Sequence, residues 1–149
     1  MAIKVGIIFD THGLLRPAVL EELQSCDYIL HGGDVNKPEI LDTLRAIAPL
    51  YVVRGNNDKE WAENIPESLT FQIEEFRFFV VHNKKFVPKS LDDIDVVIYG
   101  HSHKYSEQTL SGILWLNPGS CGKRRFDQEI TFAMMTVDGI KVEVEKIQI

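Results

Sequence analysis

The chain has 149 residues, of which 44% are hydrophobic, and its formal net charge is −6 at pH 7. This length and apolar content predict one folded domain, residues 1–149, and exclude a disordered chain. The negative charge argues against general nucleic-acid binding, because phosphate backbones are bound by basic surfaces. No apolar run could span a bilayer, and the N-terminus lacks a signal-peptide pattern, so we expect a cytoplasmic protein. Cys26 and Cys121 are expected to be reduced in that compartment.

The first half of the chain alternates apolar strands with amphipathic helices. Strands are expected at Ile3–Phe9, Tyr28–His31 and Leu50–Val53, and each is followed by a polar loop. Helices are expected at Pro17–Ser25 and Pro38–Ile47, where proline occupies a first helical position and apolar residues share one face. This alternation predicts parallel β-α-β units, whose ligand-binding loops lie at the carboxyl ends of the strands.

The second half of the chain predicts strands joined mainly by short turns. These strands are Thr70–Ile73, Arg77–Val81, Asp95–Tyr99, Gln108–Leu110, Ile113–Leu116, Glu129–Val137 and Ile140–Ile149. Asp138-Gly139 is the strongest of the hairpin signals. Both halves together predict an α/β fold with two sheets. An exposed strand such as Thr70–Ile73 could pair between two copies, which leaves a homo-oligomer open.

Strand after strand ends in a residue that can bind metal. The set consists of Asp10, His12, Asp34, Asn56, His82, His101 and His103. Manganese, iron and zinc accept imidazole nitrogen together with carboxylate and amide oxygen, and loops at strand ends can bring such groups together. Seven ligands are too many for one zinc ion. The set therefore predicts two divalent ions that share a bridging carboxylate, which we assign to Asp34.

The order of these motifs is Asp-x-His, Gly-Asp, Gly-Asn-x-Asp, His and Gly-His-x-His. It resembles the calcineurin-like metallophosphoesterases, in particular their small branch of prokaryotic phosphodiesterases, over nearly the whole chain. The resemblance implies a four-layer α/β/β/α sandwich of two mixed sheets flanked by helices. It also implies two ligand sets, one of Asp10, His12, Asp34 and His103, the other of Asp34, Asn56, His82 and His101.

The function implied is hydrolysis of phosphodiester bonds by metal-activated water. The expected substrate is a small phosphoester whose identity the sequence does not reveal, and manganese is favoured over nickel, iron and zinc. A phosphomonoesterase is the alternative enzyme. The alternative of another class is a scaffold, because a retromer subunit shares this fold and serves as a binding module. All seven ligand positions are filled here, which favours the enzyme.

Two further candidate catalytic residues accompany Asp34. Asn57 stands where relatives carry histidine or cysteine, and an amide cannot act as a general acid at neutral pH. We therefore expect poor leaving groups to react slowly, while Asn57 could still contact substrate. His31 either orients Asp34 or a water, or simply packs in the core. Phe9 replaces a small hydroxyl residue of the family and is expected to narrow the site or shift its loops.

Three basic groups fall near the same loops. They are Arg16, Lys84-Lys85 and Lys123-Arg124-Arg125. Arginine can hold phosphate oxygens with two N–H groups, although charged runs are usually solvated surface. Asp58 is expected to support its loop or a neighbouring histidine rather than to bind metal.

Overall fold

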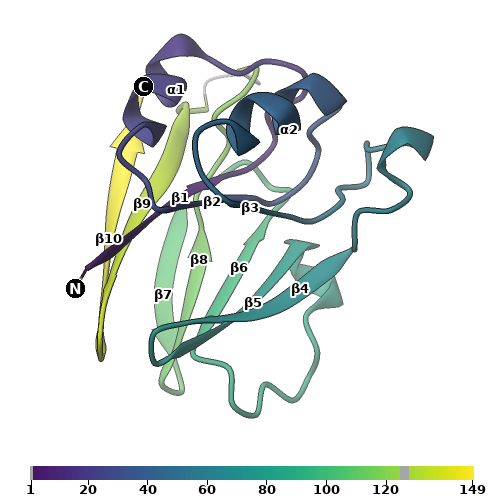
Figure 1. Cartoon of the computed structure of the whole chain (residues 1–149). Helices are drawn as coiled ribbons and strands as arrows, with labels where there is room; N and C mark the ends of the chain where they lie inside the picture. Colours follow the sequence, from purple (N-terminus) through teal and green to yellow (C-terminus); the bar gives the residue numbers. More distant parts are fainter. Residues whose placement is uncertain (1, 125–127) are drawn as a thin grey trace.

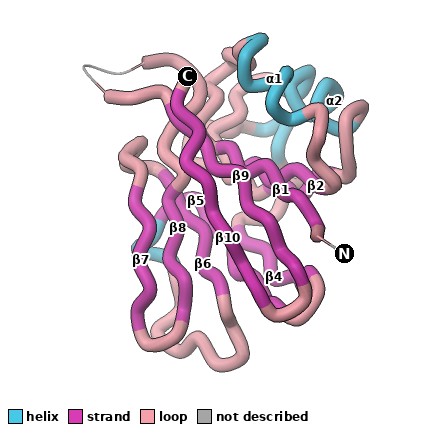
Figure 2. The backbone as a smooth tube through the Cα atoms, turned by 90° about the vertical axis from the view of Figure 1, so that its left-hand side faces the viewer, coloured by secondary structure: helices cyan, strands magenta, loops and turns pink. Residues whose placement is uncertain are grey.

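Two five-stranded mixed sheets face each other in the computed structural model, which describes residues 2–124 and 128–149 (Figure 1). The first sheet has the strand order β10-β9-β1-β2-β3, and the second has the order β4-β5-β6-β8-β7. Two α-helices cover the outer face of the first sheet (Figure 2). This arrangement confirms the predicted α/β fold of two mixed sheets, although in the described residues the outer face of the second sheet lacks the α-helical layer that the four-layer prediction places there.

The first sheet combines three parallel strands with a C-terminal hairpin. Its elements are β1 (Ile3–Ile8), α1 (Pro17–Leu23), β2 (Tyr28–His31), α2 (Pro38–Arg45), β3 (Leu50–Val52), β9 (Thr131–Asp138) and β10 (Lys141–Gln148). Strands β1, β2 and β3 are parallel, whereas β9 runs antiparallel to both β1 and β10. The final hairpin thus returns to the sheet that the N-terminal half builds.

The second sheet is made entirely from the middle of the chain. Its strands are β4 (Ser68–Ile73), β5 (Phe76–Asn83), β6 (Val96–Gly100), β7 (Ser106–Leu110) and β8 (Ile113–Asn117). The three central strands β5, β6 and β8 are parallel, while the edge strands β4 and β7 are antiparallel to their neighbours. The predicted strand Thr70–Ile73 is therefore part of an edge strand.

Buried apolar side chains form three clusters that match the layers. The largest lies between the two sheets and includes Ile7, Phe78 and Ile98. A second lies between the first sheet and the helices. The third, which includes Val97, lies on the outer face of the second sheet beneath the loop residues Val87, Leu91 and Ile94. In the described residues this outer layer contains a short 3-10 helix, η2 (Lys84–Phe86), and no α-helix.

The expected elements differ from the observed ones mainly at their ends. Helix α1 ends at Leu23, two residues early, because the N–H of Gln24 bonds to Glu21 in the tighter 3-10 pattern. Strand β7 begins at Ser106, two residues before the expected start. Both cysteines are free and buried. Among the described residues, no helix is long and apolar enough to cross a membrane.

Candidate metal centre

The register of the strands brings the predicted residues to one edge of the sandwich. In the first sheet Ile8, His31 and Val52 lie side by side, so the loops after β1, β2 and β3 start at the same level. In the second sheet Asn83 is paired with Gly100, so the chain leaves β5 and β6 at the same level. Each sheet therefore presents a row of loops at the carboxyl ends of its parallel strands.

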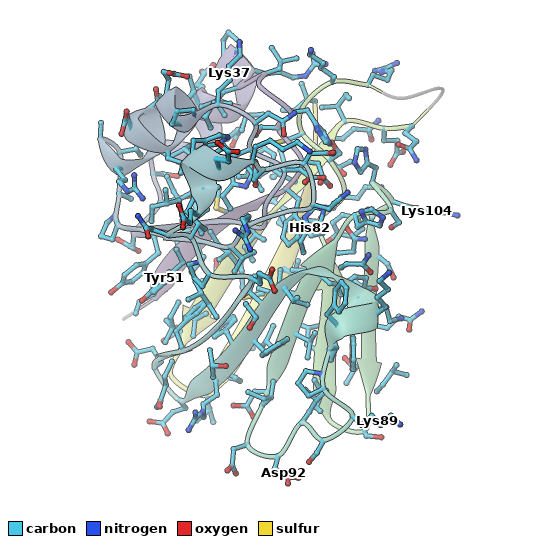
Figure 3. All side chains as sticks on the ribbon, turned by 90° about the vertical axis from the view of Figure 1, so that its right-hand side faces the viewer. Lys37, Tyr51, His82, Lys89, Asp92 and Lys104 are labelled. Atoms are coloured by element: carbon cyan, nitrogen blue, oxygen red, sulfur yellow. The ribbon has the colours of Figure 1, made fainter. Side chains whose placement is uncertain are left out.

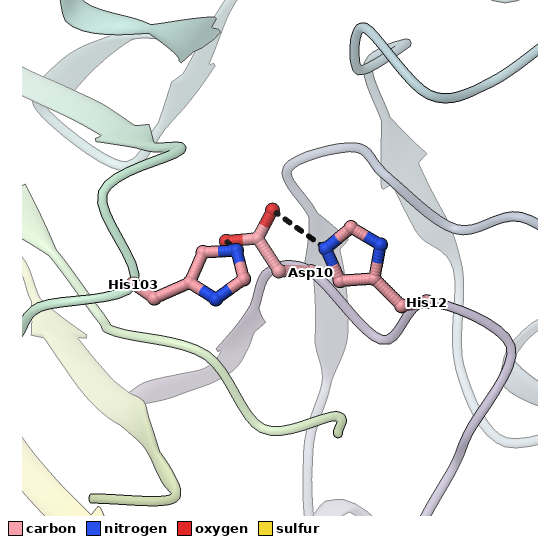
Figure 4. Close-up of side chains that lie close together, drawn as sticks. All are labelled: Asp10, His12 and His103. Carbon is pink, nitrogen blue, oxygen red and sulfur yellow. Dashed lines mark ion pairs between the residues drawn. The ribbon is translucent and has the colours of Figure 1, made fainter. Parts of the chain in front are cut away.

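One group of predicted ligands joins the two sheets: Asp10 and His12 follow β1, and His103 follows β6. One side-chain donor atom of each residue lies within 4.8 Å of the other two. Asp10 Oδ1 is 4.0 Å from His12 Nε2, and Asp10 Oδ2 is 3.4 Å from His103 Nε2. Figure 4 shows the Asp10 carboxylate between the two imidazole rings. These three side chains could hold one metal ion.

A second group consists of Asp34, which follows β2, His82 in β5, and His101 after β6. His82 Nε2 is 3.0 Å from Asp34 Oδ2, and the rings of His82 and His101 have centroids 5.5 Å apart. His82 Nδ1 lies 2.9 Å from the carbonyl oxygen of Gly32. A carbonyl can only accept a hydrogen bond, so Nδ1 carries the proton and Nε2 is directed at Asp34.

The two groups adjoin each other. Asp34 Oδ2 is 3.8 Å from His12 Nε2, and Asp10 Oδ1 is 3.6 Å from His82 Nε2. Asn56, the seventh predicted ligand, is exposed and lines a cleft together with His82. The other six predicted ligands fall into the two groups described above, as the resemblance implies. Their role as metal ligands stays a prediction.

The electrostatics of the site favour bound cations. Burial raises the pKa of Asp34, but hydrogen bonds from His82 and Asn57 and the nearby imidazoles outweigh it and lower the pKa to about 2. Burial lowers the pKa of His82, but Asp34 and Asp10 outweigh it and raise the pKa. A buried carboxylate beside imidazole nitrogen thus demands positive charge, which either protons or divalent ions can supply. The donor set fits two such ions.

Much of the site has left-handed backbone, which side chains other than glycine rarely adopt. The φ angles are +58° at Asp10, +47° at His12, +56° at Asp34, +76° at His101 and +61° at His103. Such conformations cost on the order of 1–3 kcal/mol each and cluster at functional sites. The strained backbone of these loops therefore directs the side chains into the site and lowers the stability of the folded chain.

His31 ties two of the loops together beneath the site. Its Nδ1 accepts the N–H of Gly33 at 3.1 Å, so its Nε2 carries the proton and donates to Thr11 Oγ1 at 2.9 Å. Thr11 in turn donates to the carbonyl of Val35. Burial, with the neighbouring imidazoles, lowers the pKa of His31 to about 3, which keeps the ring neutral. Of the two roles expected, the contacts match support of the loop that carries Asp34.

Two residues after β3 hold neighbouring loops. The backbone N–H of Asn57 donates to Asp34 Oδ1 at 2.8 Å, and its side-chain Nδ2 donates to Asp34 Oδ2 at 3.3 Å. Asp58 accepts the N–H of Asn36 at 2.8 Å and that of Gly55 at 3.0 Å. The expected loop-supporting role of Asp58 is confirmed. The sequence did not predict that Asn57 would position Asp34.

Phe9 lies under the site rather than in its mouth. Its side chain is fully buried, and its ring stacks on that of His82 with centroids 6.1 Å apart. The ring occupies the space where a Cβ atom at Gly32 or Gly100 would stand. Glycine at these two positions therefore makes room for a large side chain before Asp10.

Two of the predicted basic residues, Arg16 and Lys84, contact other parts of the chain. Arg16 donates from Nε and Nη2 to the carbonyl of Gly122 at 3.2 and 3.1 Å. The Lys84 ammonium lies 5.3 Å from the ring centroid of Tyr99, on the second sheet. Lys123 and Arg124 are exposed, and Arg125 lies outside the described residues.

A cleft of about 320 Å³ adjoins the second group of ligands. Its wall includes His82 and Asn56 together with three residues that the sequence analysis did not select, Arg54, Glu67 and Phe86. Arg54 stands only two positions before Asn56, so a search for basic residues in every strand-end loop would have found it. Glu67 lines the cleft because the residues before β4 lie beside the loop after β3. Local sequence patterns do not predict such a tertiary contact.

Comparisons with known proteins show the family and the fold. A family model described as a calcineurin-like phosphoesterase superfamily domain matches residues 3–139. A probable metallophosphoesterase of Methanothermobacter thermautotrophicus is 30% identical, with 97% of this chain and 91% of the relative covered. A phosphodiesterase of Methanocaldococcus jannaschii is 28% identical, with 79% and 84% covered. Vps29 of Chaetomium thermophilum shares the fold, with a TM-score of 0.81, 22% identity, and 98% and 97% of the chains covered.

Proposed function

We propose that this chain, which belongs to the calcineurin-like phosphoesterase superfamily, hydrolyses phosphodiester bonds by water attack at two divalent metal ions. The observation that carries the proposal is the pair of adjoining groups, Asp10 with His12 and His103, and Asp34 with His82 and His101. Asn56 completes the second set, because it lies beside His82 in the wall of the same cleft. Manganese is the favoured metal for this mixed nitrogen and oxygen set.

Each side chain has a defined task in this proposal. When bound, the two ions neutralise the phosphate oxygens, activate water and stabilise the leaving oxygen. Asp34 lies near the histidines of both groups and would hold both ions, while Asn57 fixes the orientation of its carboxylate. The bond from His82 Nδ1 to Gly32 keeps Nε2 directed into the site. His31 holds the loop that carries Asp34.

The leaving group departs without a side-chain acid to protonate it in this proposal. Asn57 occupies the position where an acid would stand in relatives, and its amide is bonded to Asp34. An amide does not release a proton at neutral pH. The leaving oxygen is therefore stabilised by charge or protonated by water, which favours substrates with good leaving groups.

Phosphodiesters are favoured over phosphomonoesters by the similarity to a named phosphodiesterase. The scaffold alternative draws support from the shared fold with Vps29, which at 22% identity concerns the fold alone. The scaffold role gives no reason for six metal-binding side chains to converge from two sheets with strained backbone. A cytoplasmic location is proposed from the two free, buried thiols.

The proposal is tested with protein stripped by a chelator and then supplied with manganese, nickel or zinc. We expect hydrolysis of bis-p-nitrophenyl phosphate to exceed that of p-nitrophenyl phosphate, and Asp34→Asn to abolish both. Asp42→Asn, which changes an exposed carboxylate on α2, serves as the matched control and should retain activity. A stripped protein that stays inert with every metal contradicts the enzyme, and an active Asp34→Asn variant contradicts the bridging role.

A further inference from the structure

The cleft beside the second ligand group has walls from three separate segments. The loop after β3 contributes Arg54, Gly55 and Asn56. Glu67, which precedes β4, and Ser68, its first residue, form the second segment, and residues 81–83 with Phe86 come from the end of β5 and from η2. The backbone N–H of Arg54 donates to the carbonyl of Pro66 at 2.8 Å, which fixes the first segment against the second. The cleft opens directly onto His82, which Figure 3 labels on this side of the molecule.

The lining of the cleft includes an arginine that is paired with a glutamate. Arg54 Nη2 donates to Glu67 Oε1 at 2.8 Å. The Arg54 side chain is 30% exposed and that of Glu67 is 79% exposed, so the pair stands at the rim rather than in the core. Guanidinium has five N–H groups in a fixed plane, so one bond to Glu67 orients the fork and leaves donors for a ligand.

The lining of the cleft also includes an exposed aromatic ring. Phe86 is 65% exposed, although Lys85 Nζ lies 5.1 Å from its ring centroid. Val81 adds a buried aliphatic surface to the same wall. A ligand that covers this exposed ring would remove apolar surface from water, which favours binding. The lining thus offers both a surface for stacking and a hydrogen-bond donor.

We propose that this cleft holds one ester substituent of the substrate, a planar aromatic ring with a hydrogen-bond acceptor at its edge. The inference rests on the proposed function, because the phosphoryl group must lie at the metal centre. The ring packs on Phe86, and the acceptor receives an N–H of Arg54. The volume of about 320 Å³ suits a substituent of this size and is larger than a methyl ester could fill.

The test measures competitive inhibition of bis-p-nitrophenyl phosphate hydrolysis by three probes. Inorganic phosphate has no substituent, phenylphosphonate adds the ring, and 4-carbamoylphenylphosphonate adds an acceptor at the edge of the ring. Phe86→Ala should weaken inhibition by both phosphonates by about threefold to tenfold and leave inhibition by inorganic phosphate unchanged. Arg54→Gln should weaken inhibition by the carbamoyl probe alone, by roughly the same factor.

Leu110→Ala is the matched control, because Leu110 is a half-exposed apolar side chain at the far end of β7. It should leave all three inhibition constants unchanged. Unaltered inhibition by phenylphosphonate in Phe86→Ala overturns the proposal, and so does an equal loss for inorganic phosphate, which would place Phe86 at the metal centre. These outcomes presuppose turnover. Absence of turnover by the unaltered protein with every metal instead contradicts the proposed function, and the inference falls with it.

Discussion

At the scale of single residues, the side chains around the ligands decide how the site is built. Asn57 holds the Asp34 carboxylate with two N–H groups, and His31 holds the loop beneath it. The sequence marked both residues as candidates but left their roles open. The roles depend on partners 23 and 20 positions away, Asp34 and Thr11, which only the folded chain brings close.

Asn57 leads to a prediction about leaving groups. For aryl methyl phosphates under rate-limiting chemistry, we expect turnover to fall steeply as the pKa of the leaving phenol rises. Asn57→His supplies a proton donor and should flatten that dependence, with a gain on the order of tenfold for the poorest leaving group. Asn57→Ala supplies no donor, so its turnover should keep the steep dependence on the pKa of the leaving phenol. A flat profile in the unaltered protein contradicts this account.

His31 leads to a prediction about stability and pH. Its pKa is about 3 in the folded chain and near 6.5 when unfolded, so the unfolded chain binds the proton more readily in between. Folding stability is therefore lost as pH falls below 6.5. Between pH 7 and pH 5 the loss from this group is about 2 kcal/mol.

The measurement compares urea unfolding of the metal-free protein with that of His31→Gln at both pH values. The variant cannot titrate at this position. Between pH 7 and pH 5 its free energy of unfolding should therefore fall by about 2 kcal/mol less than that of the unaltered protein. If both proteins show the same fall, His31 is not the buried neutral group described.

At the scale of elements, the sequence predicted the parallel strands and their loops well. The apolar run Tyr28–His31 and the helical periodicity after Pro38 are local signals. The strand has the predicted bounds, and the helix begins at Pro38 as predicted but ends at Arg45 rather than at Ile47. The outer layer of the second sheet could not be predicted so well. Val87, Leu91 and Ile94 have the i, i+4, i+7 spacing of one helix face, yet their segment, which contains Pro88, forms no α-helix, so only their packing identifies them. The cleft was missed for the same reason, since Glu67 meets Arg54 through tertiary contact.

Asp58 gives a prediction for the loops. Its two carboxylate oxygens accept the N–H groups of Asn36 and Gly55 and so hold together the loops after β2 and β3. Asp58→Ala leaves two backbone donors without this acceptor and should lower the free energy of unfolding by about 2–4 kcal/mol. Asp58→Asn keeps one acceptor oxygen and should lose roughly half as much. Urea unfolding checks both values. An Asp58→Ala variant as stable as the unaltered protein would show that Asp58 does not hold the two loops together.

At the scale of the whole molecule, each sheet supplies part of the candidate metal centre. Asp10, His12 and Asp34 come from the loops of the first sheet, whereas His82, His101 and His103 come from the second. Neither sheet alone holds either group, because His103 completes the first group and Asp34 the second. The sequence predicted which residues converge, but not that both groups would draw ligands from both sheets.

The central claim is that this convergence creates a two-metal hydrolase. It is tested most directly by following bis-p-nitrophenyl phosphate hydrolysis while chelator-stripped protein, at a concentration well above the dissociation constants, is titrated with manganese. The account predicts activity that rises from zero and reaches its plateau at two ions per chain. A plateau at one ion per chain, or no activity at any amount of manganese, nickel or zinc, would contradict it.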